Sequence, residues 1–173
     1  MSKHNEISNV LVSSGAIKFG DFTLTSGRKS DFYVDVKKAS SDPNILSKIA
    51  HCLSVEAPED IDTLAGMELG AIPLIVATSL EMHLPFAMIR KESRSHGTNS
   101  RVEGVLGKKI LIIEDVATTG GSIEDVVSVL RAEGSEVNTA LVVVDREEGA
   151  TESLKKIGVK LKSLVTISEV RGN

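Results

Sequence analysis

The stretch that decides the fold is Ile110-Leu-Ile-Ile-Glu-Asp-Val-Ala-Thr-Thr-Gly-Gly-Ser122. Its four leading apolar residues predict a strand that is buried on both faces, as in a parallel sheet. Beyond the glycines, apolar residues recur at helical spacing and predict a helix that begins near Gly121: Ile123, Val126, Val127 and Leu130. Because open α/β sheets bind ligands at the carboxyl ends of their strands, we expect a ligand site at this junction.

The residues of the turn indicate which ligand would bind there. Gly120 and Gly121 permit a tight bend that brings backbone N–H groups close to a ligand. Three neighbours add hydroxyl groups: Thr118, Thr119 and Ser122. The helix N-terminus adds positive potential, so the turn suits one phosphate. Glu114 and Asp115 would repel a phosphate but can accept hydrogen bonds from two sugar hydroxyls. Together these groups predict a site for a ribose 5-phosphate group.

All thirteen positions of the stretch resemble the 5-phosphoribosyl 1-diphosphate motif of the type I phosphoribosyltransferases. The chain has neither the Gly-Lys-Ser/Thr ending of a Walker loop nor the spaced glycines of a dinucleotide site at this turn. An ordinary strand–turn–helix with a decorated turn is the structural alternative. The resemblance implies an α/β fold with a mostly parallel central sheet flanked by helices, a small N-terminal hood and a mobile lid loop. It also implies that nine residues bind phosphoribosyl diphosphate: Glu114, Asp115, Val116, Ala117, Thr118, Thr119, Gly120, Gly121 and Ser122.

Length and composition suit a small enzyme. We expect residues 1–173 to form one domain, because a chain of 173 residues can bury a stable core. The net charge of −4 argues against a general nucleic-acid binder. The one cysteine, Cys52, cannot form an internal disulfide and is expected to be a core residue. No run approaches the roughly 18 apolar residues of a membrane span, and the first ten residues are polar. These features predict a cytoplasmic protein that binds no membrane.

Helical and extended patterns alternate along the chain. We expect a helix over about 5–14 that stops at Gly15, and a hairpin over 22–36 with its turn at Ser26-Gly27. Asp42-Pro43 is a helix N-cap followed by proline at the first helical position. Further strands are expected near 63–65, 86–89, 110–113, 141–144 and 161–165. Such alternation predicts a mostly parallel sheet with right-handed crossovers.

A basic loop follows the strand that ends at Ile89. The segment Arg90–Gly104 lacks apolar periodicity, so we expect a structureless exposed loop of about sixteen residues, of the kind that is usually functional or disordered. Its five possible cations could bind a diphosphate: Arg90, Lys91, Arg94, His96 and Arg101. The segment is similar to the mobile catalytic loop of the orotate phosphoribosyltransferases, with arginine at position 94 where many members have lysine. The resemblance implies a lid over 91–107 with Lys91, Arg94 and His96 as catalytic residues, and assigns Arg90 to the diphosphate.

Two further segments resemble the orotate site of the same family. Residues 22–35 are similar to a hood in which an aromatic pair, here Phe32 and Tyr33, covers the pyrimidine. Thr25 stands where many bacterial members have a lysine. Arg146 lies where the family places the arginine that binds orotate, although its acidic neighbours also suit an ordinary ion pair. The resemblance implies that Thr118, Arg146, Phe32 and Tyr33 contact orotate.

The segment Gly66–Pro73 is expected to form a second strand-to-helix turn. In the family this turn binds diphosphate and often contains a non-proline cis peptide. Many bacterial relatives have a lysine near the position of Gly70, and this chain does not.

The resemblance implies transfer of the phosphoribosyl group from phosphoribosyl diphosphate to orotate, giving orotidine 5′-monophosphate and diphosphate, a step of pyrimidine biosynthesis. It implies Mg²⁺ carried mainly by the diphosphate and the ribose hydroxyls, and a homodimer that shares its lid loops between subunits. Two other functions stay open: a phosphoribosyltransferase for another base, and a regulator that senses phosphoribosyl diphosphate.

Overall fold

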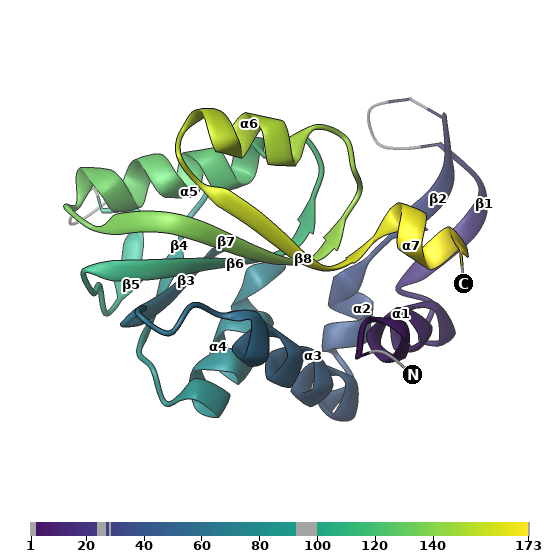
Figure 1. Cartoon of the computed structure of the whole chain (residues 1–173), viewed down its shortest axis with the longest axis horizontal. Helices are drawn as coiled ribbons and strands as arrows, with labels where there is room; N and C mark the ends of the chain where they lie inside the picture. Colours follow the sequence, from purple (N-terminus) through teal and green to yellow (C-terminus); the bar gives the residue numbers. More distant parts are fainter. Residues whose placement is uncertain (1–2, 24–26, 28, 93–99, 173) are drawn as a thin grey trace.

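A six-stranded sheet lies at the centre of the computed structural model, which describes residues 3–23, 27, 29–92 and 100–172 (Figure 1). Its strands are β3 (Thr63–Met67), β4 (Phe86–Ile89), β5 (Val102–Gly104), β6 (Lys109–Ala117), β7 (Glu136–Asp145) and β8 (Lys160–Thr166), in the order β5-β4-β3-β6-β7-β8. Only the pairing of β4 with β5 is antiparallel among these strands. The predicted mostly parallel sheet is confirmed.

Helices cover both faces of this sheet. α3 (Pro43–Glu56) and α4 (Ala71–Met82) lie on one face, and α5 (Gly121–Ala132) and α6 (Ala150–Lys156) lie on the other (Figure 1). The predicted cap of α3 is confirmed, because the Asp42 side chain accepts hydrogen bonds from the N–H groups of Asn44 and Ile45. The helix predicted near Gly121 begins at that residue.

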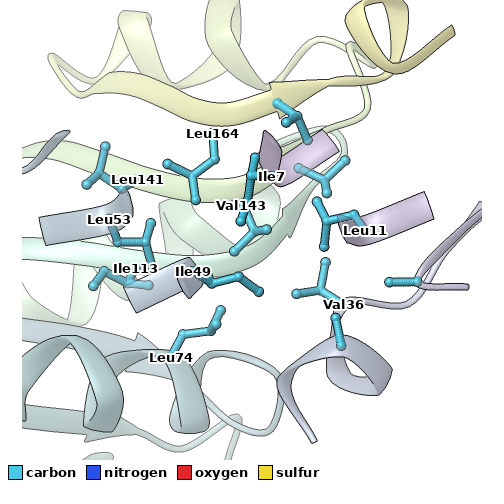
Figure 2. Close-up of a cluster of buried hydrophobic side chains, with 14 of the residues drawn as sticks. Ile7, Leu11, Val36, Ile49, Leu53, Leu74, Ile113, Leu141, Val143 and Leu164 are labelled. Carbon is cyan, nitrogen blue, oxygen red and sulfur yellow. The ribbon is translucent and has the colours of Figure 1, made fainter. Parts of the chain in front are cut away.

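Two hydrophobic clusters hold these layers together. Figure 2 shows part of the first, in which Leu53 of α3, Leu74 of α4 and Ile113 of β6 meet. The second cluster joins β6 to α5 and α6 and contains Ile112 and Ile123. Successive residues of a strand point to opposite faces, so β6 contributes to both clusters in alternation. This burial on two sides explains its continuous apolar run.

The N-terminal part forms a separate two-stranded sheet beside the central one. α1 (Lys3–Ser13) leads to β1 (Ile17–Thr23), which pairs antiparallel with β2 (Lys29–Val34). The hairpin therefore begins five residues before its predicted start, and its register shifts between Phe19 and Phe22. It also ends earlier than predicted, because Val36 starts the short helix α2 (Val36–Ser40). The predicted stop at Gly15 is confirmed by its left-handed φ of 72°.

A C-terminal helix, α7 (Ile167–Gly172), connects the two sheets. Thr166 and Glu169 form a capping box in which each side chain accepts a hydrogen bond from the other residue's backbone N–H. Near the end of α7, the Arg171 guanidinium lies 2.6 Å from the Asp31 carboxylate of β2. The same guanidinium lies over the rings of Phe19 and Phe32. The helix therefore ties the hairpin to the end of β8.

The segment after β4 differs from the structureless loop that was predicted over 90–104. Residues 102–104 form β5, which pairs with the edge of β4, and Val102 packs against the second hydrophobic cluster. A three-residue strand with one apolar residue carries no detectable periodicity, which is why the pattern failed to indicate it. Residues 102–104 of the predicted lid segment 91–107 are therefore part of the sheet, and the lid itself stays a prediction. Residues 93–99 lie outside the described part of the chain.

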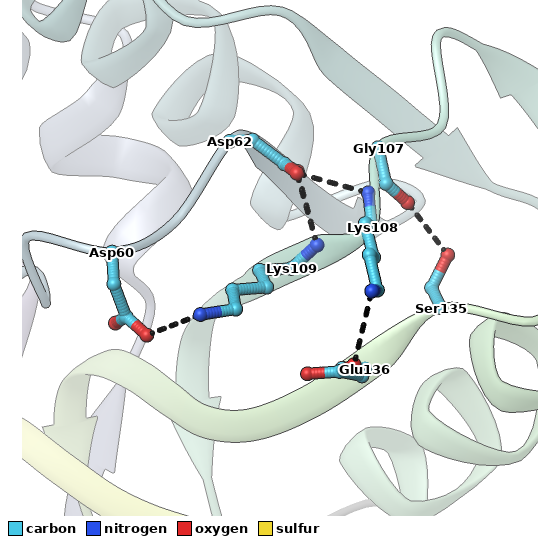
Figure 3. A network of polar contacts seen from close by, with 7 residues as sticks. All are labelled: Asp60, Asp62, Gly107, Lys108, Lys109, Ser135 and Glu136. Carbon is cyan, nitrogen blue, oxygen red and sulfur yellow. Dashed lines mark hydrogen bonds and ion pairs between the residues drawn. The ribbon is translucent and has the colours of Figure 1, made fainter.

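Hydrogen bonds and ion pairs connect the residues at the amino ends of the strands. Figure 3 shows the Asp62 carboxylate accepting hydrogen bonds from the N–H groups of Lys108 and Lys109. Lys109 also pairs with Asp60 at 3.0 Å, and Ser135 donates a hydrogen bond to the Gly107 carbonyl. The acids at this edge of the sheet therefore have partners at the same edge.

The register between β6 and β7 contains one irregularity near these amino ends. Lys109 pairs with Glu136, but Leu111 pairs with Thr139, so β7 has one more residue than β6 in this interval. Beyond the bulge the pairing is regular up to Ala117 and Asp145. No helix among the described residues is long and apolar enough to span a membrane.

Candidate functional site

The two acids of the deciding stretch lie inside β6, which continues four residues past its predicted end. Val116 still pairs with Val144 of β7, so Glu114 and Asp115 belong to the carboxyl end of a central strand. The Glu114 side chain is buried, whereas Asp115 is half-buried. The acids are thus held by the sheet rather than by a flexible turn.

Burial of Glu114 has an electrostatic consequence. Desolvation and the negative charge of Asp115 raise the pKa of the Glu114 carboxyl to about 8, although the positive charge of Lys91 opposes this shift. Burial therefore favours the protonated form of Glu114, in which this carboxyl can donate a hydrogen bond as well as accept one.

Asp115 is held on several sides. Its Oδ1 accepts a hydrogen bond of 2.9 Å from the Val116 N–H, and its Oδ2 lies 3.6 Å from the Lys37 ammonium of α2. Gly70, the residue before α4, packs so closely that a Cβ there would clash with this carboxylate. The carboxyl end of β6 thus meets the N-terminus of α4 at Asp115.

The turn after β6 has the form expected of a phosphate cradle. The exposed residues are Thr118, Thr119, Gly121 and Ser122. Gly120 is buried against Ala150 of α6 with a φ of 93°, a left-handed conformation that glycine adopts without strain. No side chain of the described residues caps α5 at Gly120. The N-terminus of a twelve-residue helix, flanked by hydroxyl groups, therefore faces solvent and suits an anion.

Arg146 lies directly beside this turn, on the neighbouring strand end. Its backbone N–H donates a hydrogen bond of 3.0 Å to the carbonyl of Ala117, the last residue of β6. The Nε and Nη2 atoms of its guanidinium each lie 2.8 Å from the same oxygen of Glu148. The ion pair considered from the sequence is therefore present. It leaves the Nη1 donors of the guanidinium outside the Glu148 contact.

The hood hairpin brings one aromatic ring to Arg146. The guanidinium carbon of Arg146 lies 4.7 Å from the ring centroid of Phe32, which is a cation–π contact. Tyr33, the next residue in β2, points to the other face of the strand and stacks against Phe22 at 5.7 Å. The prediction treated Phe32 and Tyr33 as one pair, but within this chain only Phe32 joins Arg146.

The lid segment is described only at its two ends. Arg94 and His96 lie outside the described residues, whereas Lys91 is exposed and donates its backbone N–H to Glu68 at 2.8 Å. Arg90 pairs with Glu103 of β5 at 3.1 Å. Arg101, one of the five possible diphosphate-binding cations, forms a two-pronged ion pair with Asp125 of α5. Its Nε also donates to the Arg90 carbonyl, so Arg101 fastens the base of the loop.

The turn between β3 and α4 lies beside this base. The peptide between Glu68 and Leu69 is cis, as the resemblance implied for this turn. Glu68 accepts the hydrogen bond from Lys91, and Gly70 contacts Asp115. The predicted strand-to-helix turn thus connects the lid base to the acid pair.

One charged residue of the site was not found from the sequence. Lys37 lies in the short helix that follows the hairpin. In the sequence it is one of two adjacent lysines after a strand, a pattern that does not indicate a binding site. Among the described residues, no group of three or more His, Cys, Asp or Glu side chains could hold a metal ion by itself.

Comparison with known proteins agrees with this architecture. Residues 40–169 match the family model described as the phosphoribosyl transferase domain. An orotate phosphoribosyltransferase of Thermoplasma volcanium is 53% identical over 169 residues, which cover 95% of this chain and 99% of that protein.

Solved structures give the same result. The crystal structure of orotate phosphoribosyltransferase from Aeropyrum pernix has a TM-score of 0.86 and 36% identity, covering 96% of each chain. The Mycobacterium tuberculosis enzyme in complex with 5-phospho-alpha-D-ribosyl 1-diphosphate has a TM-score of 0.80 and 25% identity. The alignment with this second structure covers 98% of this chain and 99% of that chain.

Proposed function

The chain belongs to the phosphoribosyltransferase family and, within it, to the orotate phosphoribosyltransferases, and on this premise we propose how its residues divide the work. The enzyme transfers the phosphoribosyl group of phosphoribosyl diphosphate to orotate, giving orotidine 5′-monophosphate and diphosphate. One observation carries the assignment of the site. The acid pair of β6 leads straight into the exposed Thr118–Ser122 turn, and Arg146 is hydrogen-bonded to Ala117 between them.

The sugar phosphate is assigned to the β6–α5 junction. Exposed hydroxyl groups and N–H groups at residues 118–122 bind the 5′-phosphate, with Val116 and Ala117 shaping the approach to the turn. Glu114 and Asp115 hold the ribose hydroxyls. As the ribose gains positive charge in the transition state, a carboxylate near the ring offsets that charge.

The base is assigned to the β7 end and the hood. Arg146 offers its remaining N–H donors to the orotate, and Thr118 lies in the turn beside it. Phe32, which packs against the Arg146 guanidinium, is assigned to the apolar side of the orotate site. Tyr33 is assigned to orotate on the resemblance alone, because its ring lies on the other face of β2, against Phe22.

The leaving diphosphate is assigned to the lid. Lys91, Arg94 and His96 supply cations that stabilise the negative charge growing on it, and Arg90 supports them from the base of the loop. A closed lid also keeps water from the activated sugar. We further propose that the protein is a cytoplasmic homodimer in which each lid serves the neighbouring subunit.

Mg²⁺ fits the oxygen donors of this site. This cation characteristically binds through one or two carboxylates together with substrate phosphates, and the charge of Lys91, which we assign to the diphosphate, acts on Glu114 of the acid pair. When bound, Mg²⁺ would neutralise charge on the diphosphate. We assign it mainly to the diphosphate and ribose hydroxyls of the substrate.

A panel of bases tests the substrate assignment. Purified protein is incubated with phosphoribosyl diphosphate, Mg²⁺ and either orotate, uracil, adenine or hypoxanthine, and the nucleotide formed is quantified by chromatography. We expect efficient turnover of orotate alone. Comparable turnover of a purine would favour a phosphoribosyltransferase for another base, and binding of phosphoribosyl diphosphate without any turnover would favour the sensing regulator.

A further inference from the structure

Lys37 stands where the hood meets the sugar side of the candidate site. It belongs to α2, which begins directly after β2, and Asp35 joins these two elements. The Lys37 ammonium lies 3.3 Å from Oδ1 of Asp35 and 3.6 Å from Oδ2 of Asp115. A single cation therefore connects the end of the hood strand to the acid that we assign to a ribose hydroxyl.

The backbone that carries this cation is firmly anchored. Val36, Ala39 and Ser40 are the buried residues of α2, and the helix packs against β6. Burial alone would lower the pKa of Lys37, but the charges and hydrogen bonds of Asp115 and Asp35 outweigh it and raise the pKa. The side chain thus remains a cation across the neutral range, and the buried residues of α2 hold the backbone that carries it.

Asp115 is held by the Val116 N–H, by a side-chain hydrogen bond with Glu114 and by the charge of Lys37. The Val116 N–H fixes its Oδ1, and Lys37 is the cation at its Oδ2, beside the closely packed Gly70. The Asp115 side chain is 15% exposed and the Lys37 side chain 54%, so solvent screens this ion pair in part, from the lysine side. Without Lys37, the Oδ2 side of the carboxylate would lose its charged contact.

We propose that Lys37 is a positioning residue for phosphoribosyl diphosphate. It fixes the Asp115 carboxylate in the orientation that accepts a ribose hydroxyl, and it acts through Asp115 rather than on the substrate itself. The proposal rests on the assignment of Asp115 made under the proposed function.

The first test compares two lysines of the same helix. Lys37→Gln is expected to raise the KM for phosphoribosyl diphosphate about three- to ten-fold, the range of a partly screened ion pair, and to leave the KM for orotate unchanged. Lys38→Gln removes the same charge from an exposed neighbour and should change neither constant. Lys37→Arg keeps the cation and should recover most of the affinity. An unchanged KM in Lys37→Gln, or equal effects of both glutamine variants, would overturn the proposal.

The second test is a double-mutant cycle read by calorimetric binding of phosphoribosyl diphosphate without orotate. If Lys37 acts through Asp115, Lys37→Gln should weaken binding in the wild-type background and have no further effect in Asp115→Asn. An equal loss in both backgrounds would mean that Lys37 contacts the substrate directly, and the positioning role would be wrong. A wild-type protein that binds phosphoribosyl diphosphate but does not consume orotate would refute the proposed function instead, and this cycle would still be readable.

Discussion

The two ends of the central sheet treat their charged residues differently. At the amino ends, the carboxylates of Asp60 and Asp62 are matched by Lys109 and by backbone N–H groups of the same edge. At the carboxyl ends, two acids are adjacent in β6, and one of them is buried with a strongly raised pKa. Exposed acids that are matched by cations and N–H groups indicate a structural role, whereas a buried acid with a raised pKa near an exposed helix N-terminus indicates a ligand site. The contrast separates the stabilising edge from the functional one.

The largest effect on activity is expected from changes in the lid, which we assign to the functional edge of the sheet. Replacing Lys91 and Arg94 with alanine should lower kcat by roughly 10²–10³-fold, as when a preorganised electrostatic group is removed. The measurement is steady-state kinetics with both substrates saturating. A matched control is Lys108→Ala, an exposed lysine at the amino edge.

The same variants give a complementation test. If the lid acts in trans, mixing Lys91→Ala/Arg94→Ala with Asp115→Asn creates hybrid dimers with one intact site, and activity should partly return at low substrate concentration. Absence of recovery after proven subunit exchange would show that each lid serves its own subunit.

A smaller effect is expected at the acid pair. Asp115→Asn keeps an oxygen for the Val116 N–H but loses the charge, so the affinity for phosphoribosyl diphosphate should fall about 10- to 100-fold. The melting temperature should change little, and calorimetric titration measures the binding. Glu136→Gln, at the amino end of β7, is the control and should leave the affinity unchanged. Normal affinity in a folded Asp115→Asn protein would remove this residue from the assigned sugar site.

Glu114 should lower the stability of the ligand-free protein as the pH rises from acid to neutral values. Its folded pKa of about 8 lies above the ordinary value of 4.5, so the native state retains a proton that the unfolded chain has lost. The free energy of unfolding therefore falls as pH rises from about 4.5 to about 8, by at most about 1.4 kcal/mol per pH unit. Glu114→Gln should remove this dependence in denaturant titrations without ligand. If the free energy of unfolding of Glu114→Gln depended on pH as steeply as that of the wild type, the raised pKa of Glu114 would be wrong.

Asp62 should show the opposite dependence and the smallest effect. Hydrogen bonds from Lys109 and Lys108 outweigh desolvation and lower the pKa of Asp62. Its contribution is present above the unfolded pKa and is lost as pH falls through the folded pKa. Asp62→Asn should cost about 1 kcal/mol of stability at pH 7, because the hydrogen bonds are exposed, and less in acid. Activity at saturating substrate should stay unchanged. A loss of turnover would show that the amino ends of the strands also contribute to function.

The sequence predicted the parts of the site that one continuous segment determines. The run 110–122 contains its own strand, acids, turn and helix start; the helix begins at Gly121 as predicted, whereas the strand extends to Ala117 and so includes both acids. Burial of Glu114 was not predicted, because it depends on β7 and the turns that surround the strand end. Lys37 was missed for the same reason, since its partner Asp115 is 78 residues away along the chain.

Two features that were not predicted could have been inferred from the local sequence. The spacing of Thr166 and Glu169 is that of a capping box, and it could have indicated α7. Alternation along β2 could have indicated that Phe32 and Tyr33 face apart. By contrast, β5 is defined only by its pairing with β4, and no pattern within three residues could have predicted it.

The bulge between Lys109 and Leu111 has a consequence for how this gene can change. The extra residue of β7 sets the register that ends with Ala117 opposite Asp145, and so it determines that Arg146 emerges beside the phosphate turn. A one-residue insertion or deletion in either strand would exchange the inward and outward faces up to the site. Homologous chains should therefore vary in length within surface turns, while the distance from the bulge to Arg146 stays constant.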